Sequence, residues 1–181
     1  MKECDDLFRR LHAGDEKALD AMIRDYFAGL VRFIDRYLHD TPAAEDVAMD
    51  VFFEVMTHPS RYNGTSSVKT YLCMIGRSRA LTYLRRHAMT VVTDVEEMVG
   101  FAATECVETV PESAERDAAV RDAVAKLPAA MQEAVRLVYF EEFSYKEAAA
   151  VMKKTEKQVD NLLYRAKAML RDTLKKGGWQ P

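Results

Sequence analysis

Residues that break helices are scarce in this sequence, which has seven glycines and five prolines among 181 residues. Runs of β-branched residues are also few. Apolar residues make up 49% of the chain, which is enough to build packed cores. The composition predicts a mostly helical protein, of a length that suits one domain or two small ones.

Cysteine is also rare, and the spacing of the three cysteines does not fit a Cys-x-x-Cys site. Cys4, Cys73 and Cys106 are scattered, without a Cys-x-x-Cys pair, and this pattern is typical of reduced thiols in a cytoplasmic protein. No run of eighteen apolar residues is present, so we expect no membrane span. The N-terminal MKECDDLFRR lacks an apolar stretch after its charges, so we expect no signal peptide.

Catalytic and metal-binding motifs are missing. The four histidines are isolated, and neither His-Glu-x-x-His spacing nor a glycine-rich phosphate loop occurs. Most carboxylates fall on helix faces, where solvation is the usual explanation. The sequence therefore predicts a protein that is not an enzyme and that uses no cofactor and no metal ion.

Acidic residues are absent from the segment 55–93. Its six basic residues are Arg61, Lys69, Arg77, Arg79, Arg85 and Arg86. Tyrosines lie among them, and cations interleaved with rings suit single-stranded nucleic acid, whose phosphates need charge and whose unstacked bases need flat faces. Alternatively, Tyr71 and Tyr83 belong to the core and the arginines form a solubilising face. Solvated faces normally mix both signs of charge, which weakens that alternative.

The chain as a whole is acidic, with a net charge of −3. Proteins that bind nucleic acid alone and without specificity are usually basic overall, so the balance argues against that class. The charge instead alternates along the sequence, in four successive segments that are acidic, basic, acidic and basic. On the helix expected after residue 41, Glu45, Asp46, Asp50 and Glu54 lie largely opposite the apolar residues.

Hydrophobic periodicity predicts consecutive helices. Apolar residues recur every three or four positions over 19–37, a helix with Thr41 as its N-cap and Pro42 in its first turn follows, and another runs over 68–87. We expect an all-α fold with two small helical domains, 1–90 and 113–176, joined by an acidic linker, 91–112. The second domain should contain four helices: 113–126, the segment PAAMQEAVRLVYFEEF and a final pair.

That final pair has two helix-start signals, Ser144-x-x-Glu147 and Thr155-x-x-Gln158, which both fit the capping box. They predict a short helix, a break at 153–155 and a long second helix, which is the arrangement of a helix-turn-helix. The apolar residues that this second helix should bury are Val159, Leu162, Leu163, Ala166, Leu170 and Leu174. Gln158, Asn161 and Arg165 could then reach base edges in a major groove, although an ordinary helix pair with a solvated face would show the same spacing.

Three stretches resemble the sigma factors of the sigma-70 family, of the compact extracytoplasmic-function (ECF) type. AEDVAMDVFFEVM is similar to the family's polymerase-binding helix, RYNGTSSVKTYLCMIGRSRALTYLRRH to the loop and helix of region 2, and LPAAMQEAVRLVYFEEFSYKEAAAVMKKTEKQVDNLLYRAKAMLR to region 4. The sequence departs from the family pattern at Met49, Tyr71, Ser78, Thr82 and Gln158.

The resemblance implies a protein that binds core RNA polymerase and directs promoter recognition, DNA melting and transcription initiation. The residues expected to bind polymerase are Glu45, Asp46, Asp50, Phe53 and Glu54. Those expected to bind the melted −10 element are Arg61, Tyr62, Asn63, Lys69, Tyr71, Arg77, Arg79, Tyr83, Arg85 and Arg86. Those expected to bind the −35 duplex are Thr155, Lys157, Gln158, Asn161, Tyr164, Arg165 and Lys167.

Two other functions are possible on the residues alone. A stand-alone helix-turn-helix transcriptional regulator would bind its operator without polymerase, and a protein-binding helical adaptor would not touch nucleic acid. The regulator leaves the acid-free segment and the acidic face of the helix after residue 41 unexplained. The resemblance also implies an anti-sigma partner, which no residue identifies, and a linker that follows a nucleic-acid channel, for which plain solvation is an equal alternative.

Overall fold

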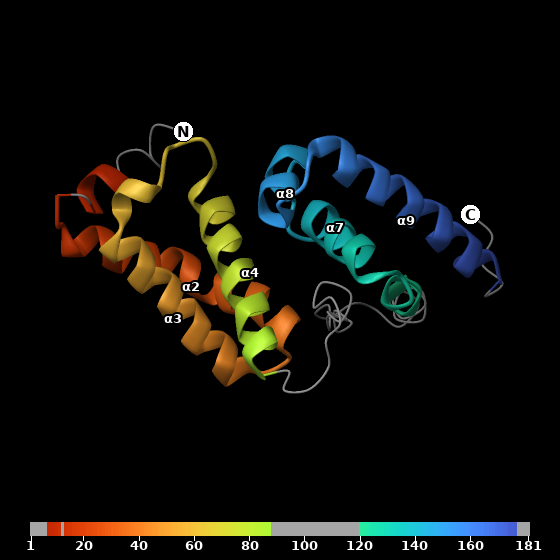
Figure 1. Cartoon of the computed structure of the whole chain (residues 1–181), viewed down its shortest axis with the longest axis horizontal. Coiled ribbons are helices and arrows are strands. Elements are labelled where there is room, and N and C mark those ends of the chain that lie inside the picture. Colours follow the sequence, from red (N-terminus) through yellow and green to blue (C-terminus); the bar gives the residue numbers. More distant parts are fainter. Residues whose placement is uncertain (1–6, 12, 88–119, 177–181) are drawn as a thin grey trace, which may run out of the picture. The chain divides into compact units, whose positions relative to one another are not determined.

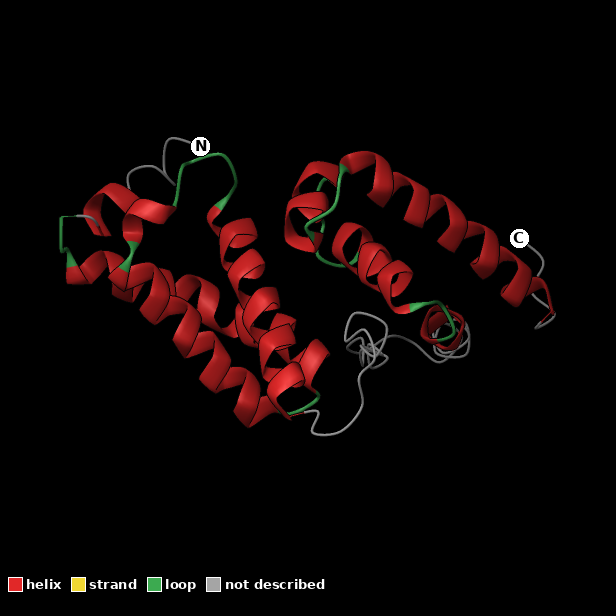
Figure 2. Ribbon diagram, viewed as in Figure 1, coloured by secondary structure: helices red, strands yellow, loops and turns green. Residues whose placement is uncertain are grey.

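The computed structural model describes residues 7–11, 13–87 and 120–176. All regular elements within these ranges are helical (Figure 2), and the chain divides into two compact units, Met1–Val91 and Val92–Pro181. The predicted linker, 91–112, and the first residues of the predicted helix 113–126 lie outside the described residues.

The first unit is built on three long helices (Figure 1): α2 (Glu16–Leu38), α3 (Thr41–Thr57) and α4 (Val68–His87), with a single 3₁₀ turn, η1 (Pro59–Arg61), after α3. Each of the three packs on the other two. A Cβ atom at Gly76 of α4 would lie 3.1 Å from Leu30 and 3.3 Å from Ile34 of α2. The glycine therefore permits a close crossing of these helices.

The start of α3 differs from the prediction at one residue. Asp40, not Thr41, is the N-cap: its extended backbone precedes the helix, and its carboxylate accepts a hydrogen bond from the amide of Ala43 at 3.1 Å. An aspartate is at least as good an N-cap as a threonine. Thr41 lies inside the helix and donates its hydroxyl to Asp35 at 3.2 Å.

The second unit contains α7 (Ala129–Tyr139), α8 (Tyr145–Met152) and α9 (Glu156–Lys176), preceded by helical residues 120–125. The predicted helix-turn-helix is present, with its break at residues 153–155. Both capping boxes form: Ser144 with Glu147, and Thr155 with Gln158. Lys153, between the two helices, has the left-handed backbone that ends α8.

Two expectations for this unit need correction. α7 ends at Tyr139 instead of continuing to Phe143, because Glu142 has a positive φ of 58° and Phe143 turns back into the core. On α9 only part of the expected stripe is fully buried, namely Val159, Leu163 and Ala166, while Leu162, Leu170 and Leu174 are partly exposed. The small unit has too little interior to cover the whole helix.

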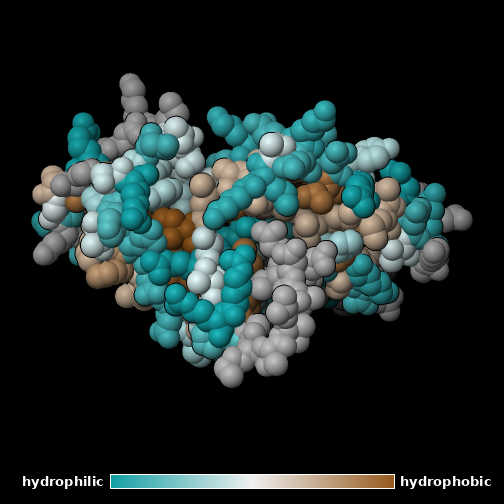
Figure 3. All heavy atoms as spheres, in the orientation of Figure 1, coloured by the Kyte–Doolittle hydropathy of each residue, from teal (hydrophilic) through white to brown (hydrophobic). Residues whose placement is uncertain are grey.

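Hydrophilic residues cover most of the face seen in Figure 3, and hydrophobic residues form small separate patches. No helix in the described ranges has both the length and the apolar character to cross a membrane.

Candidate nucleic-acid interface

The outward side of α3 combines acidic and apolar side chains. Glu45, Asp46 and Asp50 are exposed, as predicted for a binding face. Three large apolar residues lie beside them: Met49 is 53% exposed, Phe53 63% and Met56 45%. We call these three residues the α3 stripe, because a spacing of four and then three residues places them on one side of the helix.

Met49 and Met56 were not predicted as binding residues. The signal was present in the sequence, because both lie out of phase with the buried Val47, Val51 and Val55. Large apolar side chains that are exposed side by side on one helix are a candidate interaction site.

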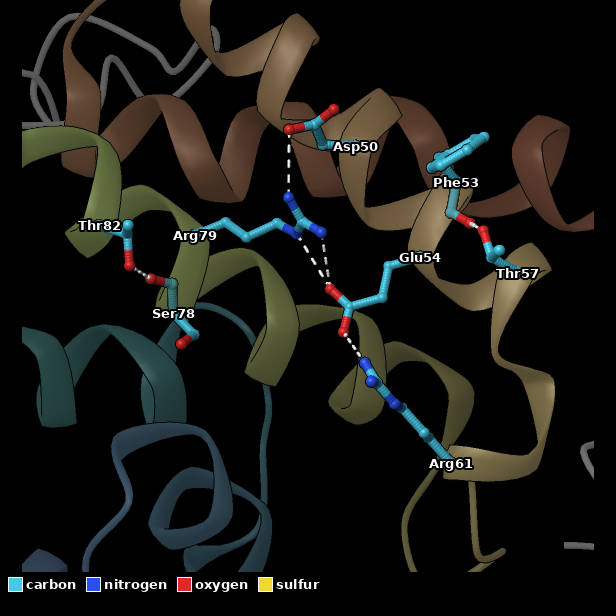
Figure 4. A network of polar contacts seen from close by, with 8 residues as sticks. All are labelled: Asp50, Phe53, Glu54, Thr57, Arg61, Ser78, Arg79 and Thr82. Carbon is cyan, nitrogen blue, oxygen red and sulfur yellow. Dashed lines mark hydrogen bonds and ion pairs between the residues drawn. The ribbon is translucent and has the colours of Figure 1, made fainter. Parts of the chain in front are cut away.

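Asp50, Glu54, Arg61 and Arg79 form an ion-pair network between α3, η1 and α4 (Figure 4). The Arg79 guanidinium donates to one Glu54 oxygen from Nη2 at 2.8 Å and from Nε at 3.1 Å, and to Asp50 from Nη1 at 3.1 Å. Arg61 donates to the other Glu54 oxygen at 2.8 Å. Two residues predicted to bind polymerase are thus paired with two predicted to bind DNA.

The network should show measurable energetic coupling. We expect Glu54→Gln and Arg79→Gln each to lower the free energy of unfolding, and the double variant to lower it less than the sum, with a coupling of about 0.5–1 kcal/mol because the pair is only part-buried. Urea unfolding of the four proteins measures this, and 1 M salt should reduce the coupling. Arg85→Gln, at the exposed end of α4, is the control. Strictly additive single effects would contradict the assignment.

The loop 62–67, which connects η1 to α4, has a defined conformation. Asn63 accepts hydrogen bonds from the amide and the hydroxyl of Thr65 at 3.1 and 2.6 Å, and the Tyr62 hydroxyl donates to the Ser66 carbonyl. Gly64 has a φ of 72°, a conformation that glycine adopts readily. At the end of the loop, Ser67 accepts from the amide of Thr70 at 3.1 Å and so caps α4.

Tyr62, the first residue of the loop, and Tyr71 of α4 are both half-buried. Their rings contact each other, with centroids 5.1 Å apart. Burial raises the pKa of Tyr71; the charge of Glu54 raises it further, and Arg61 lowers it. Because the ordinary pKa of a tyrosine is already near 10, the phenol stays neutral at physiological pH.

The other predicted −10 residues of α4 differ in exposure. Lys69, Arg85 and Arg86 are exposed, and Tyr83 stacks on the ring of His87 with centroids 3.9 Å apart. Arg77 is only 4% exposed and lies in the core of the unit. A buried guanidinium would have to leave the core to meet a phosphate, so Arg77 is withdrawn from the residues expected to bind the −10 element.

The predicted −35 residues are all exposed, on α9 and, for Thr155, immediately before it. They are Thr155, Lys157, Gln158, Asn161, Tyr164, Arg165 and Lys167. Tyr164, at 74%, is the most exposed of the large hydrophobic side chains in the described residues. The Gln158 amide oxygen is taken by the Thr155 amide at 2.8 Å, which leaves its NH₂ group to face a partner.

A further aromatic residue belongs to this surface. The Lys167 ammonium lies 5.5 Å from the centroid of the half-exposed ring of Tyr139. A hydrogen bond to Tyr139 raises the pKa of Lys167, with smaller contributions from Tyr145 and Asp160, so this lysine stays charged. Sequence reasoning missed Tyr139, since it lies on α7, outside the helix-turn-helix.

Comparisons with known proteins match each of the two units to a region of one family. Residues 22–90 match the family described as sigma-70 region 2, and residues 117–170 match sigma-70 region 4. The RNA polymerase sigma-H factor of Pseudomonas aeruginosa is 30% identical over 171 residues, covering 89% of this chain and 88% of that protein. The chain belongs to the sigma-70 family.

Another relative indicates the extracytoplasmic-function (ECF) subfamily. The ECF RNA polymerase sigma factor SigM of Bacillus subtilis is 26% identical over 159 residues, covering 88% of this chain and 96% of SigM. The predicted family and all-α fold are confirmed, and this sigma factor directs promoter recognition with core RNA polymerase. A stand-alone regulator or an adaptor does not account for matches to both regions.

Solved structures share the fold. CnrH, solved with the cytosolic domain of CnrY, matches this sigma factor with a TM-score of 0.65 at 18% identity. The match covers 96% of this chain and 97% of the CnrH chain. The sigma factor RpoE of Bartonella quintana, solved with the anti-sigma factor NepR, has a TM-score of 0.62 at 19% identity, with 88% of this chain and 98% of that chain covered.

Within the described residues, no group of three or more His, Cys, Asp or Glu side chains could hold a metal ion.

Proposed function

We propose that this sigma factor divides promoter recognition among three surfaces: the α3 stripe with its neighbouring carboxylates, the loop 62–67 with the exposed cations of α4, and the outer face of α9. In this assignment the first binds core polymerase, the second binds the melted −10 strand and the third binds the −35 duplex. The protein itself catalyses no reaction and acts in the cytoplasm.

The polymerase surface is better described as apolar with an acidic border than as acidic. Asp50 and Glu54 already neutralise Arg79 and Arg61, so the acidic side chains left for a partner's cations are Glu45 and Asp46. Interfaces gain most of their affinity from desolvated aromatic and aliphatic anchors, while charges at the rim steer association. The α3 stripe provides the anchors, with Phe53 at its centre.

The −10 surface combines a defined loop with separate cations. Extruding a base from the duplex costs a few kcal/mol of stacking free energy. That cost is recovered only if a preformed site on the protein binds the base. The internal hydrogen bonds of the loop 62–67 support such a site. Lys69, Arg85 and Arg86 are exposed on α4 and supply positive charge for the phosphates of the strand.

The observation that carries the −35 assignment is the exposed set on α9 that directly follows the capped turn. A recognition helix reads bases with long polar side chains of its N-terminal turns. Asn161 and Arg165 are four residues apart on that helix, and amide and guanidinium groups pair with adenine and guanine edges, respectively.

We also propose an anti-sigma partner. The support is the fold shared with RpoE of Bartonella quintana, which was solved with the anti-sigma factor NepR.

Reconstitution tests the proposed function. We expect the isolated protein to bind promoter DNA weakly, since its net charge is −3 and two of its arginines are neutralised. Core polymerase, this protein and a duplex library with randomised −35 and −10 segments should yield run-off transcripts from selected sequences only. Core polymerase alone and the protein alone are the controls. Transcripts that start at the same sites without the protein would contradict the proposal.

A further inference from the structure

A phenylalanine near the N-terminus contacts the proposed −10 site from outside the motifs that define it. Phe8 lies in the helical residues 7–11 and is 5% exposed. Its ring stacks on Tyr62, with centroids 3.9 Å apart and an interplanar angle of 21°. It also meets Tyr71 edge-on, at 5.8 Å and 78°. With the Tyr62–Tyr71 contact, the three rings form a closed aromatic cluster.

The cluster joins the two ends of the loop 62–67. Tyr62 is the first residue of the loop, and Tyr71 lies in the first turn of α4, just after it. One ring therefore fixes the entry and the exit of the loop at once. Residue 8 precedes the stretch 22–90 that matches sigma-70 region 2, so the family match does not include this contact.

The aromatic cluster and the ion-pair network hold the loop in different ways. Arg61, immediately before the loop, is bound to Glu54 through an exposed guanidinium, and such pairs are screened by salt. The stacked rings are held by contact between apolar faces, which ionic screening does not weaken as it weakens an ion pair. If Phe8 loses its ring, Tyr62 loses the ring that stacks on it, while its edge contact with Tyr71, the internal hydrogen bonds of the loop and Arg61 remain.

We propose that Phe8 is a positioning residue for −10 recognition: it holds the loop 62–67 in the shape that receives an unstacked base, without touching DNA itself. This inference rests on the proposed role of the loop. Sites of this kind tolerate displacements of only about 0.5 Å, so a ring that sets both loop ends should affect the selection of the base.

Three variants of the full chain separate positioning from general packing. Phe8→Leu keeps an apolar side chain in the core but removes the ring, and Phe8→Tyr keeps the ring. Phe33→Leu removes another buried ring of the same unit, which pairs with Tyr37 at 5.3 Å within α2. It is the control for lost packing away from the loop.

Hydrogen exchange of the amides of residues 63–67 is the first readout. In Phe8→Leu we expect these amides to exchange about 3- to 10-fold faster than in the wild type, which corresponds to the loss of one stacked pair. Phe8→Tyr and Phe33→Leu should leave them unchanged. Equal acceleration in Phe8→Leu and Phe33→Leu would overturn the proposal. If Phe8→Leu does not unfold cooperatively, Phe8→Met serves in its place.

Base selection by the holoenzyme is the second readout. Core polymerase with each variant captures single strands from a pool of random 30-mers, and the captured strands are sequenced. Phe8→Leu should bind core polymerase normally but lose about 3- to 10-fold of the wild-type enrichment at the selected bases, with rescue in Phe8→Tyr. Unchanged enrichment would overturn the positioning role. If the wild-type holoenzyme itself enriched no motif, the proposed function would fail, while the exchange data would still judge the effect of Phe8 on the loop.

Discussion

Phe53→Asp should weaken binding of this sigma factor to core RNA polymerase by about 30-fold or more, the loss typical of a central interface anchor. Phe53 is the most exposed residue of the α3 stripe and lies between Met49 and Met56. A carboxylate at this position would have to be desolvated against apolar contacts when polymerase binds. The side chain is exposed in the isolated protein, so its replacement should leave the fold intact.

The experiment compares affinities for core polymerase in a competition assay, with thermal unfolding as the test of folding. Ala28→Asp, which adds the same charge on the exposed side of α2, is the matched control and should bind normally. Met49→Ala and Met56→Ala should each cost less than Phe53→Asp, because residues around an anchor mainly exclude water. Normal binding by Phe53→Asp would exclude the α3 stripe as the polymerase surface.

Arg165→Ala should lower −35-dependent transcription by about 5- to 150-fold, the range that corresponds to one bidentate contact to a guanine. Arg165 is exposed on α9, one turn beyond Asn161 and beside the projecting Tyr164. Loss of a base contact should also relax the preference at one position of the −35 element. A lysine such as Lys157, if it contacts phosphate, should instead weaken binding to all sequences and reduce its salt dependence.

Arg171→Ala is the matched control, since Arg171 is also exposed on α9 but lies farther from the N-terminus of the helix. Run-off transcription by the holoenzyme with each variant, on promoters with the selected or a scrambled −35 element, gives the comparison. If Arg165→Ala and Arg171→Ala reduced transcription equally on both promoters, the effect would be one of general charge, and α9 would not read bases as proposed.

Local features of the structure could be predicted from the sequence because they depend on residues a few positions apart. Ser144 with Glu147 and Thr155 with Gln158 form their capping boxes within four residues, and each box satisfies backbone donors at its own helix start. The break at 153–155 follows from the second of them. The exposure of the α9 face follows in turn from the helical period.

Contacts between helices could not be predicted in this way. Arg79 reaches Glu54 across 25 residues and Asp50 across 29, and nothing in the spacing of these residues indicates that they meet. The family resemblance assigned them to separate surfaces. Which helix faces meet depends on the packing of α2, α3 and α4 around a common core, including the close crossing at Gly76.

By itself, the sequence determined the all-α class, the helix-turn-helix with its exposed face, and the resemblance to the family, because capping, periodicity and motif spacing are local properties of the chain. Only the tertiary structure decided which charged and aromatic side chains remain on the surface. It buried Arg77, paired Arg61 and Arg79 with carboxylates, and placed Phe8 against the loop 62–67. The physical reason is that the partner and burial of each of these side chains depend on how the helices pack, which only the folded core sets.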